Sequence, residues 1–216
     1  YAVRMVELFE RRRETLTASL TVFNGELSEN WMKWKEIAFN NTHHLVPDFD
    51  EAPNTVYPVR ENPPPAVLLS SDGSQVFPSR HEIAPLALIT ISRIRIDYHQ
   101  YQDTPLLDCR ASVFLQDDFN EIVGENREIT FEDLVSDRRT LEELNALADL
   151  AEELSRKDNN IPVVALSDGS LILWRLAERF EFDYEKKFVQ RYIETLKRFQ
   201  QCQVPIAGYI SSSNSR

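Results

Sequence analysis

The alternation of apolar and polar positions predicts a helical N-terminal segment followed by a larger α/β region. Residues 4–37 have the spacing of an amphipathic helix, with an interruption near Asn24 and Gly25. Residues 40–65 contain six prolines and little periodicity, which is typical of a long loop or arm. We therefore expect a helical segment over 1–39, a proline-rich arm over 40–65, and one further domain over 66–216.

Apolar runs in that domain predict strands. The first is 66–70, the second is the alternating run 86–98, with a bulge near Ser92 and Arg93, and the third is 111–115. A fourth strand is expected at 163–166 and a last one at 204–211.

Two helices are predicted between and after these strands. The first begins at Thr130, which forms a capping arrangement with Asp133. The second covers 183–201, with Asp183 as its cap. The residues expected to face the core are Leu141, Leu144, Leu147, Leu150, Ala151 and Leu154 on the first helix, and Phe188, Tyr192, Ile193, Leu196 and Phe199 on the second.

The order of these elements predicts the fold class. A helix between two strands implies a parallel crossover, whereas the first three strands can form an antiparallel meander. The sequence therefore predicts an α/β protein with a mixed sheet, an antiparallel meander plus parallel crossover strands, flanked by helices and preceded by an N-terminal helical extension.

The tetrapeptide Ser-Asp-Gly-Ser follows two of the predicted strands, the first and the fourth, and places Asp72 and Asp168 at their ends. If these strands are neighbours, the two aspartates lie about 4.7–4.9 Å apart, one strand spacing. Two ionised carboxylates so close repel each other unless a cation or a proton lies between them, and oxygen ligands suit Mg²⁺ or Mn²⁺. The alternative is that each Asp-Gly pair is only a turn.

A third acid could come from the helix that precedes Asp168. Among its glutamates, Glu143 lies at the edge of the apolar stripe, while Glu142, Glu152 and Glu153 are further candidates. The alternative is that these acids are solvated and pair with arginines one turn away. Arg80 and His81 follow Asp72 closely and are candidates for contact with a phosphate.

Composition limits the classes of function. The chain has 216 residues, a formal net charge of −11 and 42% hydrophobic residues. The charge argues against nucleic-acid binding through a broad basic surface, but not against an enzyme that reaches phosphates through metal ions. No apolar run is long enough to cross a membrane, and two cysteines without metal spacing favour a reducing, cytoplasmic location.

The combination of a strand with DGS, a meander, an "RRTLEEL" helix, a strand ending in "DGSL", a further helix and "IAGYIS" resembles the NurA-domain nucleases over about residues 60–212. The resemblance implies an RNase H-like fold and Mn²⁺-dependent cleavage of DNA, with Mg²⁺ as the alternative ion. It places the family's site acids at Asp72, Asp168 and Glu143, with Glu142 or Glu152 as alternatives to the last.

The resemblance also implies a biological setting. Such nucleases process DNA ends in double-strand break repair, as 5′-to-3′ exonucleases and single-strand endonucleases. They act as homodimers with a HerA-type hexameric translocase. Members continue beyond the "GYIS" strand with further site residues, including a histidine, so we expect the domain over 66–216 to be incomplete at its C-terminal end.

Two other functions remain open from the sequence. One is a catalytically inactive interaction module with an RNase H-like fold, in which each Ser-Asp-Gly-Ser is only a turn. The other is an RNase H-like nuclease directed at RNA.

Overall fold

The chain forms two compact units, Tyr1–Pro63 and Pro64–Arg216, in a computed structural model. The residues that the structure describes are 2–40, 48, 50–59, 61, 64–77, 86–98, 105–115, 118, 130–156, 161–173 and 183–210.

The first unit contains two helices joined by a π-helical turn. Helix α1 spans Ala2–Val22, the turn η1 spans Phe23–Leu27, and α2 spans Trp31–Phe39. The predicted interruption near Asn24 and Gly25 is confirmed, because both residues lie in the π-helical turn. The apolar stripe of α1 is exposed to solvent; it includes Val6, Leu8, Phe9, Leu16 and Leu20.

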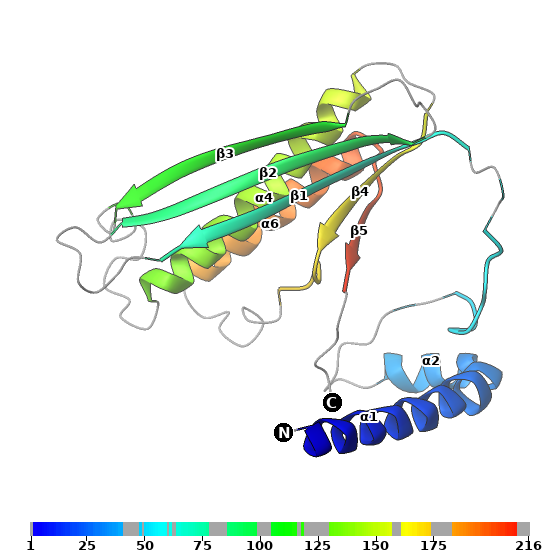
Figure 1. Cartoon of the computed structure of the whole chain (residues 1–216). Helices are drawn as coiled ribbons and strands as arrows, with labels where there is room; N and C mark the ends of the chain where they lie inside the picture. Colours follow the sequence, from blue (N-terminus) through cyan, green and yellow to red (C-terminus); the bar gives the residue numbers. More distant parts are fainter. Residues whose placement is uncertain are drawn as a thin grey trace. The chain divides into compact units, whose positions relative to one another are not determined.

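The second unit is built on a five-stranded mixed sheet with the order β3-β2-β1-β4-β5 (Figure 1). The strands are β1 (Ala66–Val76), β2 (Leu86–Tyr98), β3 (Leu106–Leu115), β4 (Val163–Asp168) and β5 (Ile206–Tyr209). Strands β1, β2 and β3 form an antiparallel meander, and β4 pairs in parallel with both β1 and β5. The predicted α/β class and mixed sheet are confirmed.

Helices α4 (Phe131–Ser155) and α6 (Asp183–Gln201) lie together on one face of this sheet (Figure 1). The predicted capping box is present, since the Thr130 side chain accepts from the Asp133 backbone N–H at 3.1 Å and the Asp133 side chain accepts from the Thr130 backbone N–H at 3.3 Å. Helix α6 has the predicted bounds, but Ile193 was wrongly expected in the core and is 45% exposed. The main core beneath the helices includes Val67, Leu69, Leu147, Leu150, Ala165 and Phe199.

The two faces of the sheet differ in what covers them. Along β1, Val67, Leu69 and Ser71 are buried against the helices, and the residues between them point to the other face. Among the described elements of this unit, none packs against that second face. It is largely apolar and partly exposed, and includes Val76, Leu86, Ile96, Leu107, Val113 and Leu115.

The end of the first predicted strand, the start of the third and the predicted bulge need correction. Strand β1 continues through the first Ser-Asp-Gly-Ser and ends at Val76. The tetrapeptide and the residues after it still pair with β2, and the last pair is Val76 with Leu88. The bulge predicted near Ser92 is absent, since that segment pairs without interruption with β1 and β3. Strand β3 begins at Leu106 rather than at 111 because the mixed segment before Ala111 is held in register by β2.

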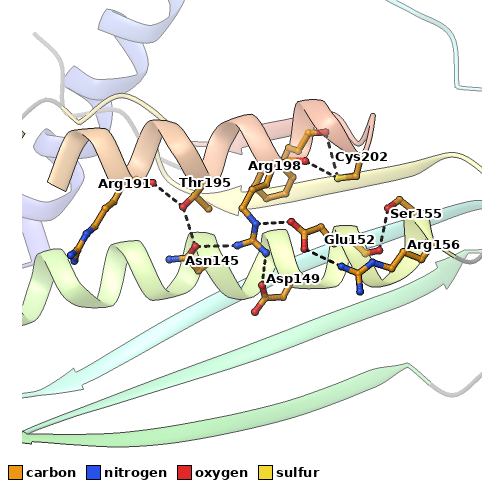
Figure 2. Close-up of polar contacts among 10 residues, drawn as sticks. Asn145, Asp149, Glu152, Ser155, Arg156, Arg191, Thr195, Arg198 and Cys202 are labelled. Atoms are coloured by element: carbon orange, nitrogen blue, oxygen red, sulfur yellow. Dashed lines mark hydrogen bonds and ion pairs between the residues drawn. The ribbon is translucent and has the colours of Figure 1, made fainter. Parts of the chain in front are cut away.

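Arg198 joins α6 to α4 through a network of hydrogen bonds (Figure 2). Its guanidinium donates to Glu152 at 2.6 Å, to Asp149 at 2.6 Å and to Asn145 at 3.2 Å, and its side chain is 26% exposed. We predict that Arg198→Ala lowers the free energy of unfolding by about 1–3 kcal/mol, because three acceptors lose a shared donor. Urea denaturation monitored by circular dichroism measures this change.

Arg191, two turns earlier on α6, provides the matched control. Its guanidinium points away from this network in Figure 2, and the described residues give it no ion pair. Arg191→Ala should change the unfolding free energy by less than about 0.5 kcal/mol. Equal losses in the two variants would contradict a structural role for the Arg198 network.

Candidate active site

Asp72 and Asp168 lie at the same level on neighbouring strands. The parallel pairing of β1 with β4 ends at Ser71 opposite Ser167, and the two aspartates are the next residues on each strand. Residues at matching positions of paired strands share a face, so both side chains project from the face opposite the helices. Both residues are exposed. The structure therefore brings the two aspartates to adjacent positions on one surface.

The two Ser-Asp-Gly-Ser segments have different backbone conformations. The first is continuous strand, whereas at the second Gly169 has φ +92°, in the left-handed region that favours glycine. The chain then turns toward the helices, where the Tyr192 hydroxyl donates to the Leu171 carbonyl at 3.2 Å. Because the chain leaves β4 on the helix side as far as residue 173, this segment does not cover the surface on which Asp168 lies.

Glu143 approaches the same end of β1 from helix α4, on the side of the sheet opposite the two aspartates. Ser71 donates through its hydroxyl to the Glu143 backbone carbonyl at 2.8 Å, which ties this turn of the helix to β1. The Glu143 side chain then lies against Gly73, where an added Cβ would be 2.3 Å from Glu143 Oε1 and 2.9 Å from Arg139 Cγ. The helix can approach this closely only because residue 73 has no side chain.

The environment of Glu143 favours its protonated form. Burial raises the pKa of Glu143 from 4.5 to about 7, and the charges of Asp72 and Asp168 act in the same direction. Arg139 and the backbone N–H of Gly73 act in the opposite direction and lower the pKa. Both aspartates are thus close enough to raise the pKa of Glu143, although burial has the largest effect.

The donor set suits a divalent cation. Three carboxylates are the hard oxygen ligands that Mg²⁺ and Mn²⁺ prefer, and the absence of a side chain at residue 73 leaves room for Glu143 beside β1. Within the described ranges, no three His, Cys, Asp or Glu side chains are grouped in a metal-binding arrangement. Glu143 Oε1 instead lies 3.2 Å from Arg139 Nε, so its carboxylate would have to turn from Arg139 to bind an ion.

The other predicted candidates lie elsewhere. Glu142 pairs with Arg138 at 2.5 Å on the helix surface, Glu152 pairs with Arg198 at 2.6 Å, and Glu153 lies 3.6 Å from Arg93. Arg80 and His81 lie outside the described residues. Glu143 is thus the one of the four glutamates that approaches β1.

Sequence reasoning missed three residues that hold Glu143 in place: Ser71, Gly73 and Arg139. Each was visible in the sequence, but only as part of a turn motif or as a surface charge. A glycine that follows the acid within a strand was the one available signal, because glycine in a strand interior often marks a close approach of another element.

The raised pKa of Glu143 predicts a pH-dependent stability. Between about pH 4.5 and pH 7 the folded state keeps a proton that the unfolded state has released, so the unfolding free energy falls as pH rises. Glu143→Gln should remove this loss and be more stable than the wild type at pH 8, by roughly 1–2 kcal/mol. Urea denaturation at pH 5 and pH 8 in a chelator measures the difference.

Glu142→Gln is the control for this experiment, because Glu142 is next in the chain but pairs with Arg138 on the helix surface. It should keep the wild-type dependence on pH. The interpretation is wrong if Glu143→Gln and the wild type lose stability in parallel between pH 5 and pH 8.

The family model of the NurA domain matches residues 67–216 of this chain. No curated protein matches the chain. Among solved structures, a NurA crystal structure matches with a TM-score of 0.32 and 15% identity, over 86% of this chain and 41% of that chain. This chain thus spans well under two thirds of that NurA chain.

Two further solved structures are similar. The N-terminal RNase H domain of Rv2228c from Mycobacterium tuberculosis matches with a TM-score of 0.33 and 14% identity, over 69% of this chain and 86% of that one. The protease–reverse transcriptase of prototype foamy virus matches with a TM-score of 0.37 and 11% identity, over 83% of this chain and 23% of that chain.

All three TM-scores are below 0.5, so the family assignment rests on the family match. That match covers more than half of the chain and includes all three acids of the site. No helix within the described residues is long and apolar enough to span a membrane. The chain belongs to the NurA domain family, a family of nucleases.

Proposed function

We propose that this chain is a metal-dependent DNA nuclease whose site is formed by Asp72, Asp168 and Glu143. The observation that supports the proposal most directly is the placement of two aspartates at matching positions on adjacent parallel strands, with a glutamate held against Gly73 beside them. The family match supports nuclease activity, and the choice of DNA, metal and partner goes beyond it.

The carboxylates of Asp72 and Asp168 would hold a Mn²⁺ or Mg²⁺ ion, and Glu143, which approaches β1 from the helix side, would hold a second ion. Such an ion supplies Lewis acidity and lowers the pKa of water. It also provides the positive charge that the acidic chain lacks where a phosphate must approach.

The residues of the chain itself have separate roles. The two strands fix the aspartates on a rigid sheet, and Ser71 and Gly73 fix the position of Glu143. In the metal-free protein, burial raises the pKa of Glu143 to about 7, so this side chain can accept or release a proton near neutral pH. We therefore propose that Glu143 receives a proton from the attacking water when it is not needed as a ligand.

The wider role follows from the family resemblance. We propose that the nuclease processes DNA ends in double-strand break repair in the cytoplasm, as a homodimer together with a HerA-type hexameric translocase. Cleavage would be 5′-to-3′ on ends, with endonuclease action on single strands. The ring of the translocase would supply DNA contacts that a protein with net charge −11 lacks.

A cleavage assay tests this proposal. The protein is incubated with 5′-labelled and 3′-labelled single-stranded DNA, duplex DNA and RNA of the same sequence, in Mn²⁺, Mg²⁺ or a chelator. We expect DNA cleavage with Mn²⁺ and none with the chelator. Preferential cleavage of RNA would favour the RNA-directed alternative, and a folded protein inactive on every substrate would favour the interaction module.

A further inference from the structure

We propose that Tyr209 is a positioning residue that stacks on a base of single-stranded DNA beside the metal-binding acids. The inference rests on the proposed nuclease function and extends it to recognition of the nucleotide. Tyr209 is the last residue of β5 and is the register partner of Asp168 on β4. Its side chain is 66% exposed.

Tyr209 belongs to a row of side chains that crosses the whole sheet. Tyr209 on β5 pairs with Asp168 on β4, and Asp72 on β1 is at the matching position beside Asp168. Ser92 on β2 pairs with Asp72, and Cys109 on β3 pairs with Ser92. Partners across a sheet share a face, so all five project from the face opposite α4 and α6. At about 4.8 Å between neighbouring strands, the backbone of Tyr209 lies roughly 5 Å from the backbone of Asp168 and roughly 10 Å from that of Asp72.

The surface around Tyr209 is open to a ligand in the described part of the chain. The segment after β4 leaves on the helix side, because Gly169 and Leu171 lie against Gly208. Gly208 precedes Tyr209 and lies on the sheet face that is turned toward the helices. A Cβ at Gly208 would be 2.6 Å from the Gly169 carbonyl oxygen. The close passage on one side leaves the tyrosine ring exposed on the other, beside the acids.

The chemistry of this surface favours a base rather than a phosphate as the partner of Tyr209. Tyr209 carries no charge, its register partner is the carboxylate of Asp168, and the whole chain carries a charge of −11, so a phosphate would be bound at the acids through a cation and not at the tyrosine. Stacking on an aromatic ring needs no positive charge and works for every base, with about 1–3 kcal/mol per base. A base stacked on Tyr209 would hold the neighbouring phosphate over Asp168.

The test compares Tyr209→Ala and Tyr209→Phe with the wild type in steady-state cleavage of single-stranded oligonucleotides with Mn²⁺. Tyr209→Ala should raise KM by about 5- to 100-fold with kcat within about 3-fold, and Tyr209→Phe should retain the wild-type values within 2-fold. Tyr98→Ala is the matched control, because Tyr98 is exposed on the same face at the far end of β2. It should leave KM unchanged.

A binding measurement separates stacking from a loss of folding. In the Asp72→Asn background, an oligonucleotide containing 2-aminopurine should lose fluorescence on binding when residue 209 is tyrosine or phenylalanine, and keep it when residue 209 is alanine. Equal KM values and equal quenching for the alanine variant would overturn the role of Tyr209. If the wild type neither binds nor cleaves DNA, the proposed nuclease function fails instead.

Discussion

Replacing Asp168 with asparagine is expected to lower the rate of DNA cleavage by at least about 100-fold, and Asp72→Asn should have an effect of the same size. Asparagine keeps the shape of the side chain but loses the charge that holds a divalent cation. Both residues are exposed, so neither change removes packing from the core. Initial rates with saturating Mn²⁺ and with a titration of Mn²⁺ measure the loss.

Asp183→Asn is the matched control, because Asp183 is an exposed aspartate at the first residue of α6 and asparagine also suits a helix start. It should retain full activity. Thermal unfolding of all three variants should remain within a few degrees of the wild type. The two-aspartate site is wrong if either Asp72→Asn or Asp168→Asn, correctly folded, cleaves at the wild-type rate.

Replacing Gly73 with alanine should have the next largest effect, about 10- to 100-fold on the rate together with about 1–3 kcal/mol of stability. The new Cβ would lie 2.3 Å from Glu143 Oε1 and 2.9 Å from both Glu143 Cγ and Arg139 Cγ. Glu143 would have to move, since its own backbone is held by Ser71. Cleavage rates and urea denaturation measure the two effects.

The double variant Gly73→Ala with Glu143→Ala distinguishes steric conflict from a general intolerance of alanine in this strand. Truncating Glu143 removes two of the three close contacts, so Gly73→Ala should cost less stability in the double variant than alone, by more than about 0.5 kcal/mol. Cleavage should stay low in the double variant because the carboxylate is gone. Additive losses of stability would show that Glu143 is not held against residue 73.

Much of the second unit could be predicted from local pattern. Helix α6 has the predicted bounds because its stripe of Phe188, Tyr192 and Phe199 is regular, and an acid stands at its start. The capping box of α4 is likewise local, since Thr130 and Asp133 are three residues apart in the chain. Interactions within a few residues are the ones that a sequence displays directly.

The two copies of Ser-Asp-Gly-Ser show what local pattern cannot decide. The same four residues are continuous strand in β1 and a turn after β4, because β2 extends alongside the first copy as far as Val76. Strand β4 pairs only with β1 and β5, and its pairing with β5 ends at Asp168 opposite Tyr209. The neighbouring strand, not the tetrapeptide, determines where the chain turns.

The identity of the third acid was also beyond the sequence. Glu142, Glu143 and Glu152 are the same residue type, and the choice among them depends on which side of α4 faces β1. The orientation of α4 about its axis is set by contacts between residues distant in sequence, such as the hydrogen bond from the Ser71 hydroxyl to the Glu143 carbonyl. Helical periodicity placed Glu143 at the edge of the apolar stripe, but not against a particular strand.

The parallel pairing of β1 with β4 has a consequence for how the protein folds. The pair brings together residues 96 positions apart, as in the hydrogen bond from Ser70 to Leu166. Closing such a long stretch of chain costs entropy before any contact compensates for it, so pairings of this kind form slowly. The meander and α4 can assemble from shorter-range contacts, and the aspartates meet only when β4 docks. Activity should therefore return later in refolding than helical circular dichroism.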